Sequence, residues 1–386
     1  MKRKIYVWPL CIRTFHWLYA LSFFAAFVLV WFENLLTLHV AFGMVFLLLA
    51  LFRLSWGIIG PLYSNFRCFD FQGDHLVNYI LHLFGQKEKT PGHNPASSWG
   101  AMVMLVLGFL LGMTGLLLYG IQEGRGIVSF LNPYFFGYMD QIGLIHTFSA
   151  YLLLAVVMIH IGGVVFEQLY HHTGIIWSMF TGYKYDTEGI DVHLDWKQNF
   201  FAAFFLFGSV WIYYYIVHTP DNALVKSRFA DIDYEKAQPV LALECGDCHI
   251  VFPAYLLPEK SWKIIMDTPE DHYGEELDLD TEDAETIRAY LLRHSAERST
   301  REAAVKVLAS VKGRENVLSI VRTPYWRKRH KEIPTKVFKS KAVDSKYSCD
   351  ACHPDILKGR IEDDAIRLPD VPFKDALKMH IYPKWR

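Results

Sequence analysis

Five apolar stretches constrain the fold of this chain more than any other feature. Each is close to the ~20 residues that an α-helix needs to cross a bilayer. They cover residues 15–31, 36–59, 99–119, 142–166 and 200–217. Residues 1–220 carry only 11 Lys and Arg and 11 Asp and Glu, whereas residues 221–386 carry 28 and 29. The first part is therefore typical of a membrane helix bundle, and the second of a domain in water.

The positions of positive charge predict the topology of the bundle. Ten Lys and Arg residues lie near one set of helix ends, and only Arg125 lies near the other. The ten are Lys2, Arg3, Lys4, Arg13, Arg53, Arg67, Lys87, Lys89, Lys184 and Lys197. Because such residues accumulate on the cytoplasmic side, we expect a cytoplasmic N-terminus and, after five spans, a periplasmic C-terminal domain if the host is a bacterium. No small-residue cleavage site follows the first apolar run, so we expect it to be an uncleaved anchor in the inner membrane.

These features predict a mainly α-helical chain with three parts. Residues 1–190 form a four-helix membrane domain, residues 191–220 a fifth transmembrane helix and linker, and residues 221–386 a small, mostly helical periplasmic domain. A further helix is expected at residues 281–292. In the bundle, Gly108 and Gly112 have the small-xxx-small spacing that lets a neighbouring helix approach closely. A net charge of −1 argues against nucleic acid as a partner, because a DNA-binding chain needs an excess of Lys and Arg.

Two identical five-residue frames hold four of the six cysteines. They are Cys245-Gly-Asp-Cys248-His249 and Cys349-Asp-Ala-Cys352-His353. In such a frame the two thiols can add to the vinyl groups of one haem, while the adjacent histidine binds its iron. A zinc ion held by all four thiolates, or a redox-active disulfide in each frame, leaves the histidine unexplained twice. The frames therefore predict two covalently attached c haems, with His249 and His353 as iron ligands.

Each c haem of an electron carrier needs a second axial ligand, from histidine or methionine. The C-terminal part offers His272, His294, His330, His380, Met266 and Met379. His272 lies in the stretch 267–285, which has ten carboxylates and no Lys or Arg, whereas His330 lies in the basic run 327–331. The residues alone do not choose between these candidates.

Four histidines fall within or at the edges of the apolar stretches, where an ionisable side chain is costly and points to a function. His146 and His160 are fourteen residues apart on one predicted helix, so they lie nearly on one face and differ in depth by about 21 Å. The expected pairs are His16 with His160 near the cytoplasm and His39 with His146 near the periplasm. Each pair is expected to hold one b haem; histidines hydrogen-bonded between helices are the alternative. Arg53 is expected to snorkel to the cytoplasmic surface rather than to neutralise a haem propionate.

Several segments of the N-terminal part resemble one family. They are FHWLYA around His16, HVAFG running to LFRLSWGIIGP, GHNPASSWGAM, and IHTFSAYLLLAVVMIHIGG followed by MFTGYK. Over about residues 5–185 they resemble the bacterial cytochrome b561 and nickel-hydrogenase cytochrome b family. In that family four helices hold two b haems, so the resemblance implies that the four membrane histidines are axial ligands and that quinone is the exchange partner. Pro9 and Cys11 depart from the pattern, which has an acidic residue and a later proline there.

The C-terminal part is similar to the dihaem cytochrome c family over about residues 243–370. The segments that carry the similarity are CGDCHIVFPAYLLPEKSW, DHYGEELDLD, IRAYLLRHSAE, TPYWRKRHKEIP, CDACH and DDAIRLP. The similarity implies bis-histidine c haems with His272 and His330 as distal ligands, in the HYGE and HKEIP contexts, and leaves His294 at the surface. We expect His272 to pair with the first haem and His330 with the second, with the crossed pairing left open.

Together these inferences predict a membrane-bound electron carrier with two haem b and two haem c groups. It is expected to work between the quinone pool and a periplasmic cytochrome or redox enzyme, with quinol:cytochrome oxidoreductase activity left open. One alternative is a cytochrome subunit that anchors a larger dehydrogenase or hydrogenase complex and co-purifies with it. Another is a haem enzyme that acts on a small oxidant, which predicts carbon monoxide binding by the reduced protein.

Other features of the sequence leave the partner and the quinone site open. Five further histidines could serve in proton exchange but are expected to be surface residues, namely His75, His82, His93, His171 and His172. The stretch 322–341 has eight Lys or Arg and one Glu, in contrast to the acidic stretch 267–285. Such a contrast can steer a charged partner, although a charge run is more often a solvated face. The resemblance to the cytochrome b family also raises the expectation of a homodimer.

Overall fold

The computed structural model of the chain describes residues 4–85, 90–185, 189–314 and 316–372. The chain forms two compact units. The first contains residues 1–28, 38–117 and 140–220, and the second contains residues 29–37, 118–139 and 221–386. Five long helices account for most of the first unit, and short helices joined by loops account for most of the second.

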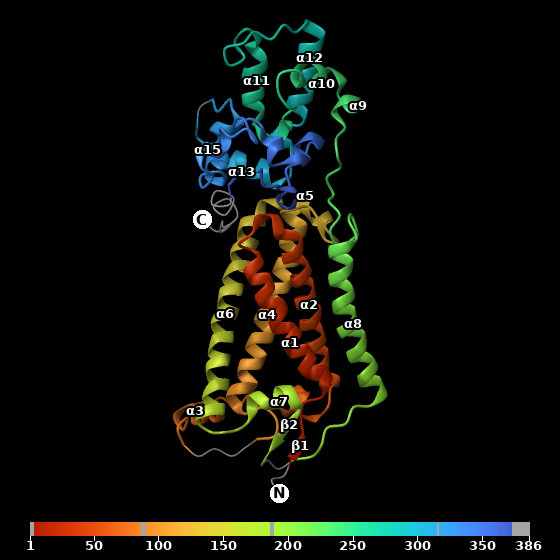
Figure 1. Cartoon of the computed structure of the whole chain (residues 1–386), viewed down its shortest axis with the longest axis vertical. Helices are drawn as coiled ribbons and strands as arrows, with labels where there is room; N and C mark the ends of the chain where they lie inside the picture. Colours follow the sequence, from red (N-terminus) through yellow and green to blue (C-terminus); the bar gives the residue numbers. More distant parts are fainter. Residues whose placement is uncertain (1–3, 86–89, 186–188, 315, 373–386) are drawn as a thin grey trace. The chain divides into compact units, whose positions relative to one another are not determined.

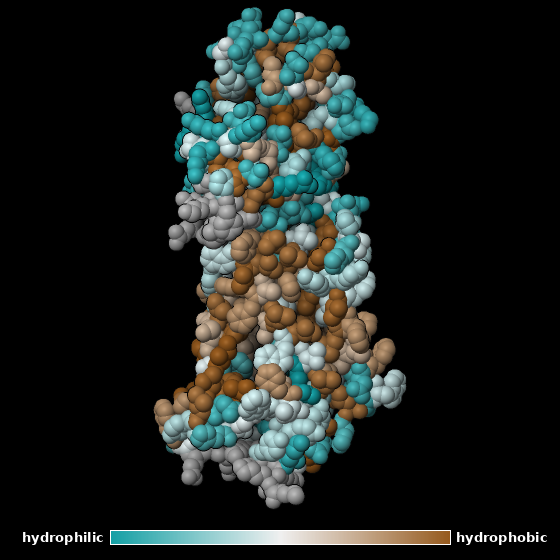
Figure 2. Space-filling model, in the orientation of Figure 1, coloured by the Kyte–Doolittle hydropathy of each residue, from teal (hydrophilic) through white to brown (hydrophobic). Residues whose placement is uncertain are grey.

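Within the residues that the structure describes, five helices are long and apolar enough to cross a membrane. They are α1 (Leu10–Leu29), α2 (Leu36–Ile59), α4 (Pro95–Ile121), α6 (Met139–Leu169) and α8 (Trp196–His218), and they run side by side (Figure 1). This confirms the five predicted spans, and α2 has the predicted bounds. Large apolar side chains such as Phe148, Ile159 and Phe207 are exposed, and the face of the bundle drawn in Figure 2 is mostly apolar. Such a surface suits lipid rather than water.

Polar residues extend two of these helices beyond the apolar stretches. The side chain of Asn94 accepts a hydrogen bond from the backbone N–H of Ser97 (2.7 Å), so α4 begins at Pro95 rather than at residue 99. Asp195 and Gln198 form a capping box, in which each side chain accepts a hydrogen bond from the backbone of the other. These caps satisfy N–H groups that a helix leaves unpaired at its start.

The predicted close approach at Gly108 and Gly112 is confirmed. A Cβ atom at Gly108 would overlap the hydroxyl of Tyr19 on α1, and a Cβ at Gly112 would lie 2.9 Å from the side chain of Leu47 on α2. The missing side chains therefore let α4 pack directly against both helices.

Short elements complete the first unit. They are the helices α3 (Gly73–Leu81) and α7 (Ile175–Thr181) and the strands β1 (Lys4–Tyr6) and β2 (Tyr183–Tyr185). The strands pair antiparallel, with Lys4 opposite Tyr185 and Tyr6 opposite Tyr183. The core of this unit includes Trp8, Phe52 and Trp56, all buried.

The second unit is a set of short helices with a mostly hydrophilic surface on the face drawn in Figure 2. The helices are α5 (Asn132–Phe135), α9 (Tyr234–Ala237), α10 (Pro239–Gly246), α11 (Glu259–Asp267), α12 (Thr281–Arg293), α13 (Glu302–Val311), α14 (Pro324–Arg329) and α15 (Thr335–Phe338). Helix α12 confirms the helix predicted at residues 281–292. One apolar core contains Trp262 and contacts Cys245, and another contains Leu256 and contacts Cys349.

The loop that follows α4 is bound within the second unit through Arg125. The guanidinium group forms an ion pair with Asp364, lies 3.6 Å from a carboxylate oxygen of Glu362, and donates to the carbonyl oxygen of Val225 (2.9 Å). Only 8% of Arg125 is exposed. A cation buried to this degree requires such partners, because an unpaired charge in the interior is strongly unfavourable.

Candidate functional site

His39 of α2 and His146 of α6 face each other across the bundle. Their ring centroids are 6.3 Å apart and their planes make an angle of 79°. Nδ1 of His39 donates a hydrogen bond to the carbonyl oxygen of Ala26 (2.9 Å). Nδ1 of His146 lies 3.2 Å from both the carbonyl oxygen of Leu111 and the hydroxyl of Thr114. A proton on Nδ1 leaves the lone pair of Nε2 available to a metal ion.

Gly115 of α4 makes room for the ring of His146. A Cβ atom at this position would lie 2.9 Å from the ring carbon Cε1, closer than side chains pack. At Gly100, on the same helix, a Cβ would meet no atom within 4 Å. The space beside the imidazole of His146 therefore depends on the glycine at position 115.

His16 of α1 and His160 of α6 are the other two membrane histidines. His160 follows His146 by fourteen residues, which is about 40° short of four turns and about 21 Å along the helix axis. The two imidazoles of His16 and His160 are close enough to interact electrostatically, and Trp17 packs edge-on against His16 with centroids 4.9 Å apart. Nδ1 of His16 is buried and has no hydrogen-bond partner among the described residues.

The first Cys-x-x-Cys-His frame lies at the end of α10 and is open to solvent. The ring centroids of His249 and His272 are 6.3 Å apart, with an angle of 23° between the planes. The backbone of His272 exchanges two hydrogen bonds with Glu275 (2.7 and 3.3 Å) across a turn whose two central residues have positive φ. This turn fixes the position of His272. Cys248 and His249 are exposed, whereas Cys245 and His272 are partly buried.

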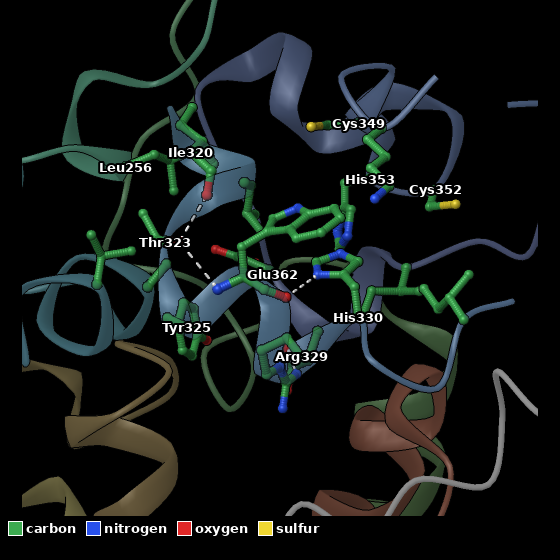
Figure 3. A pocket seen from close by; sticks show the side chains of 18 of the residues that line it. Leu256, Ile320, Thr323, Tyr325, Arg329, His330, Cys349, Cys352, His353 and Glu362 are labelled. Atoms are coloured by element: carbon green, nitrogen blue, oxygen red, sulfur yellow. Dashed lines mark hydrogen bonds and ion pairs between the residues drawn. The ribbon is translucent and has the colours of Figure 1, made fainter. Parts of the chain in front are cut away.

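The second frame lines a pocket, and its Cys349, Cys352 and His353 are partly buried. The ring centroids of His353 and His330 are 6.2 Å apart, with an angle of 64°. His330 ends α14, stacks on Trp326 (4.3 Å), and donates from Nδ1 to the carbonyl oxygen of that residue (2.9 Å). Figure 3 shows both histidines with Cys349 and Cys352 around a pocket of about 190 Å³.

Burial sets the protonation of the two histidines in this pocket. It lowers the pKa of His330 to about 4 and that of His353 to about 4. Both imidazoles are therefore neutral near pH 7, which is the form that binds metal ions. Nδ1 of His353 is buried without a hydrogen-bond partner in the described part of the chain. Gln122 and Glu123, which follow α4, also line the pocket.

The spacing of the imidazoles tests whether these sites fit a haem. Two imidazoles that bind one metal ion from opposite sides, with metal–nitrogen bonds of about 2.0 Å, have ring centroids about 6 to 6.5 Å apart. The three measured pairs have separations of 6.2 to 6.3 Å. Each histidine pair of the C-terminal part lies beside two cysteines, as covalent c haem requires. The membrane histidines have no such cysteine pair, as suits non-covalent b haem.

The remaining ligand candidates are placed elsewhere. His294 is exposed, stacks on Tyr290, and donates from Nδ1 to the carbonyl oxygen of Tyr290 (2.9 Å). Met266 packs against the core of the first frame. His380 and Met379 lie outside the described residues. The structure thus brings His272 to the first frame and His330 to the second, which is the uncrossed arrangement.

The cysteines do not form a common thiolate cage. In the described ranges, no cysteine is in a disulfide and the four frame cysteines do not gather around one point. The one group of three side chains close enough to share a metal ion there is Glu123, Glu302 and Asp363. Arg329 lies 3.4 Å from Asp363 and offsets part of its charge.

The expectation that His93 lies at the surface holds only in part, because the residue is partly buried. Its ring packs between Trp8 (5.2 Å) and Phe69 (4.5 Å), and burial lowers its pKa to about 3. His75 and His82, by contrast, are exposed, as predicted. No local pattern marks His93, because its two aromatic neighbours come from distant parts of the chain.

Two family models match the chain. The model of prokaryotic cytochrome b561 matches residues 7–182, and the model of dihaem cytochrome c matches residues 241–360. The chain is also 25% identical over 212 residues to the "Probable Ni/Fe-hydrogenase B-type cytochrome subunit" of Rhizobium leguminosarum bv. viciae. That alignment covers 47% of this chain and 89% of the relative.

Two solved structures are similar to part of the chain. A dihaem cytochrome c from Rhodobacter sphaeroides is 29% identical, with coverage of 34% of this chain and 98% of that chain and a TM-score of 0.29. A dihaem cytochrome c from Shewanella baltica is 28% identical, with coverage of 33% and 89% and a TM-score of 0.27. The two family matches imply haem b in the membrane part and haem c in the C-terminal part. The chain is therefore a membrane-bound electron-transfer haem protein, in which a region of the prokaryotic cytochrome b561 family precedes a region of the dihaem cytochrome c family.

Proposed function

We propose that this chain is a tetrahaem electron carrier that connects the quinone pool to a periplasmic redox partner. The observation that carries the proposal is the separation of 6.2 to 6.3 Å between paired imidazoles at three places in the chain. Bis-histidine ligation is typical of haems that transfer electrons without binding a substrate, because both axial positions of the iron are filled.

In this proposal each side chain has a defined role. The axial ligands of the b haems are His16 with His160 and His39 with His146, and those of the c haems are His249 with His272 and His353 with His330. The thioether bonds are made by Cys245, Cys248, Cys349 and Cys352. When bound, the haems supply reversible one-electron transfer. The protein fixes their ligation, orientation and exposure to water.

The proposed organisation places the b haems in residues 1–190, the fifth span and linker in residues 191–220, and the c haems in residues 221–386. The N-terminus lies in the cytoplasm and the c haems lie in the periplasm of a bacterial inner membrane. The ten-to-one distribution of Lys and Arg between the two sets of helix ends supports this orientation. The periplasm is also where bacteria attach haem c.

The periplasmic partner is a cytochrome or redox enzyme that approaches the first frame. Cys248 and His249 are exposed there, whereas Cys349, Cys352 and His353 of the second frame are partly buried. The stretch 267–285 around His272 carries ten carboxylates without Lys or Arg. Such a surface favours a partner with positive charge around its own redox centre, since complementary charges steer association. The chain is proposed to act as a homodimer.

A second candidate function is that of a cytochrome subunit in a larger complex. The similarity to a relative named as a Ni/Fe-hydrogenase cytochrome subunit favours it. In this case the chain co-purifies with a hydrogenase or dehydrogenase and exchanges electrons with quinone only as part of that complex. Affinity purification from the native host in mild detergent distinguishes the two candidates.

A spectroscopic count of the haems tests the proposal. The full chain in detergent is measured by reduced-minus-oxidised spectra and pyridine haemochrome quantitation, before and after extraction with acid acetone. The expected result is two extractable b haems and two covalent c haems per chain. Two c haems without b haem contradict transmembrane electron transfer. If all four haems are present, reduction by quinol tests quinone as the exchange partner.

A further inference from the structure

Arg53 lies at the level of the His16–His160 pair. It follows His39 on α2 by fourteen residues, the interval that also separates His160 from His146 on α6. One span intervenes between α2 and α6, so the two helices run in the same direction. His39 and His146 face each other. Arg53 and His160 each follow one of them by fourteen residues, so they lie in the same layer of the bundle.

Aromatic rings cover the guanidinium group of Arg53. Its Cζ atom lies 5.0 Å from the ring centroid of Phe66 and 5.7 Å from that of Phe69. Gly57 on α2 makes this possible, because a Cβ at that position would overlap the ring of Phe66. Nη1 of Arg53 is buried and has no hydrogen-bond partner among the residues that the structure describes. A buried, unpaired cationic donor is unfavourable and calls for an anion.

Lys184 of β2 brings a second cation to this region. Its Nζ donates to the carbonyl oxygens of Gly92 (3.0 Å) and Thr90 (3.3 Å), and only 9% of the residue is exposed. Burial lowers its pKa to about 8, while the carboxylate of Glu167 acts in the opposite direction. Within the described ranges, neither Arg53 nor Lys184 forms an ion pair with a carboxylate.

His93 connects the two cations to the histidine pair. Its imidazole is uncharged at neutral pH, because burial and then the charges of Arg53 and Lys184 lower its pKa to about 3. His160 also acts on it electrostatically. The ring of His93 packs against Trp8 and Phe69, and these two rings also lie against Lys184 and Arg53, respectively. Shared aromatic neighbours therefore join the two cations at His93.

We propose that Arg53 and Lys184 bind the propionate carboxylates of the haem held between His16 and His160. The inference rests on the proposed function, since that haem brings two carboxylates to this layer. A carboxylate satisfies the unpaired Nη1 donor, and a charge-assisted pair is strong where water is excluded. The same cations favour the reduced form of the haem, because the added electron places negative charge near them.

Redox titration of the full chain in detergent tests the site. Arg53→Gln is compared with Arg53→Lys and with Arg67→Gln, which removes an exposed cation nearby. In Arg53→Gln, one b haem is expected to titrate at a lower potential, with the c haems unchanged. Lys184→Met is expected to act in the same direction, and Arg53→Lys to stay closer to the native protein. Arg67→Gln is expected to leave all four potentials unchanged.

Reconstitution with haem dimethyl ester identifies the anion. With unmodified haem, Arg53→Gln is expected to retain less of this b haem than the native protein, and with both propionates esterified the two proteins are expected to retain it equally. A difference in retention of the same size with the ester means that another anion, such as phosphate or a quinone head group, occupies the site, and overturns the proposal. A shift in potential for Arg53→Gln no larger than that of Arg67→Gln also overturns it. A chain that binds no b haem contradicts the proposed function itself, whereas two b haems with unchanged potentials contradict only this inference.

Discussion

The ring centroids of His330 and His353 lie 6.2 Å apart, although His330 ends one short helix and His353 follows another. The relationship is set by packing and not by sequence spacing. Trp326 holds His330 by stacking and through its carbonyl oxygen. The pair is therefore preorganised, because the hydrogen bond from Nδ1 fixes both the tautomer and the orientation of the imidazole.

Replacing His330 by methionine is expected to change a reduction potential without releasing haem. Both c haems stay covalently attached, but the potential of one rises, because His/Met ligation gives higher potentials than His/His ligation. Spectroelectrochemical titration measures the effect. His294→Met is the matched control, since His294 makes the same kind of hydrogen bond to a carbonyl but is exposed. Equal potentials in both variants and the native protein exclude His330 as a ligand.

Replacing His146 by alanine is expected to remove one b haem. The extractable haem falls from two per chain to one, while the covalent haem stays at two, because His39 alone cannot hold a low-spin haem. Pyridine haemochrome assays give both numbers. His82→Ala serves as control, since His82 is exposed and donates to the carbonyl oxygen of Asn78. A full complement of b haem in His146→Ala contradicts the assignment.

Gly115→Ala is expected to reduce the occupancy of the same b haem. The added Cβ would press against the ring of His146 and displace it. Gly100→Ala in the same helix is the control, because it has the same helix-stabilising effect of about 1 kcal/mol but meets no neighbouring atom. The b haem content of purified protein is measured for both. The prediction fails if the two variants retain the same amount.

Arg125→Gln is expected to destabilise the C-terminal unit in a pH-dependent way. Near pH 7 the loss is about 3 kcal/mol, because Asp364 loses its ion pair and Glu362 is left with Arg360 as its cationic partner. Burial raises the pKa of Glu362, and Arg125 opposes this. Because its pKa is raised in the folded state, Glu362 contributes favourably to folding stability below the ordinary pKa of Glu. This contribution is lost as the pH rises through the pKa of Glu362 in the folded state. The destabilisation therefore shrinks on acidification.

Denaturant unfolding followed by c haem absorbance measures this effect at pH 7 and near pH 4. Lys236→Gln is the control, since the ion pair of Lys236 with Asp233 is exposed and its loss is expected to leave unfolding unchanged. An Arg125→Gln penalty that is constant over this pH range contradicts the role of the carboxylates.

Continuous hydropathy made the five spans predictable, whereas their ends depend on polar caps. Asn94 and Asp195 extend α4 and α8 through single side-chain contacts that no hydropathy window detects. The hydrogen bonds of the Asn132 side chain could not be predicted from the sequence either. This fully buried side chain donates to the carbonyl oxygen of Thr300 (3.0 Å) and accepts from Arg228 (2.7 Å), and both partners are distant in sequence.

The histidines divide in the same way. His146 and His160 lie on one helix, so helical periodicity alone gives their common face. His272 reaches the first frame through a turn held by Glu275, and sequence spacing does not reveal such a turn. The partial burial of His93 is not evident from the sequence, because its neighbours Trp8, before α1, and Phe69, after α2, are distant from it along the chain.

The fourteen-residue interval, present on both α2 and α6, limits how such a chain can change in length. Deleting one residue between His146 and His160 turns His160 by about 100° and moves it by about 1.5 Å, away from the layer it shares with Arg53. A compensating deletion on α2 would have to arise at the same time. Natural length variation is therefore expected in the connections between helices, while residues 39–53 of α2 and 146–160 of α6 keep a constant number of residues.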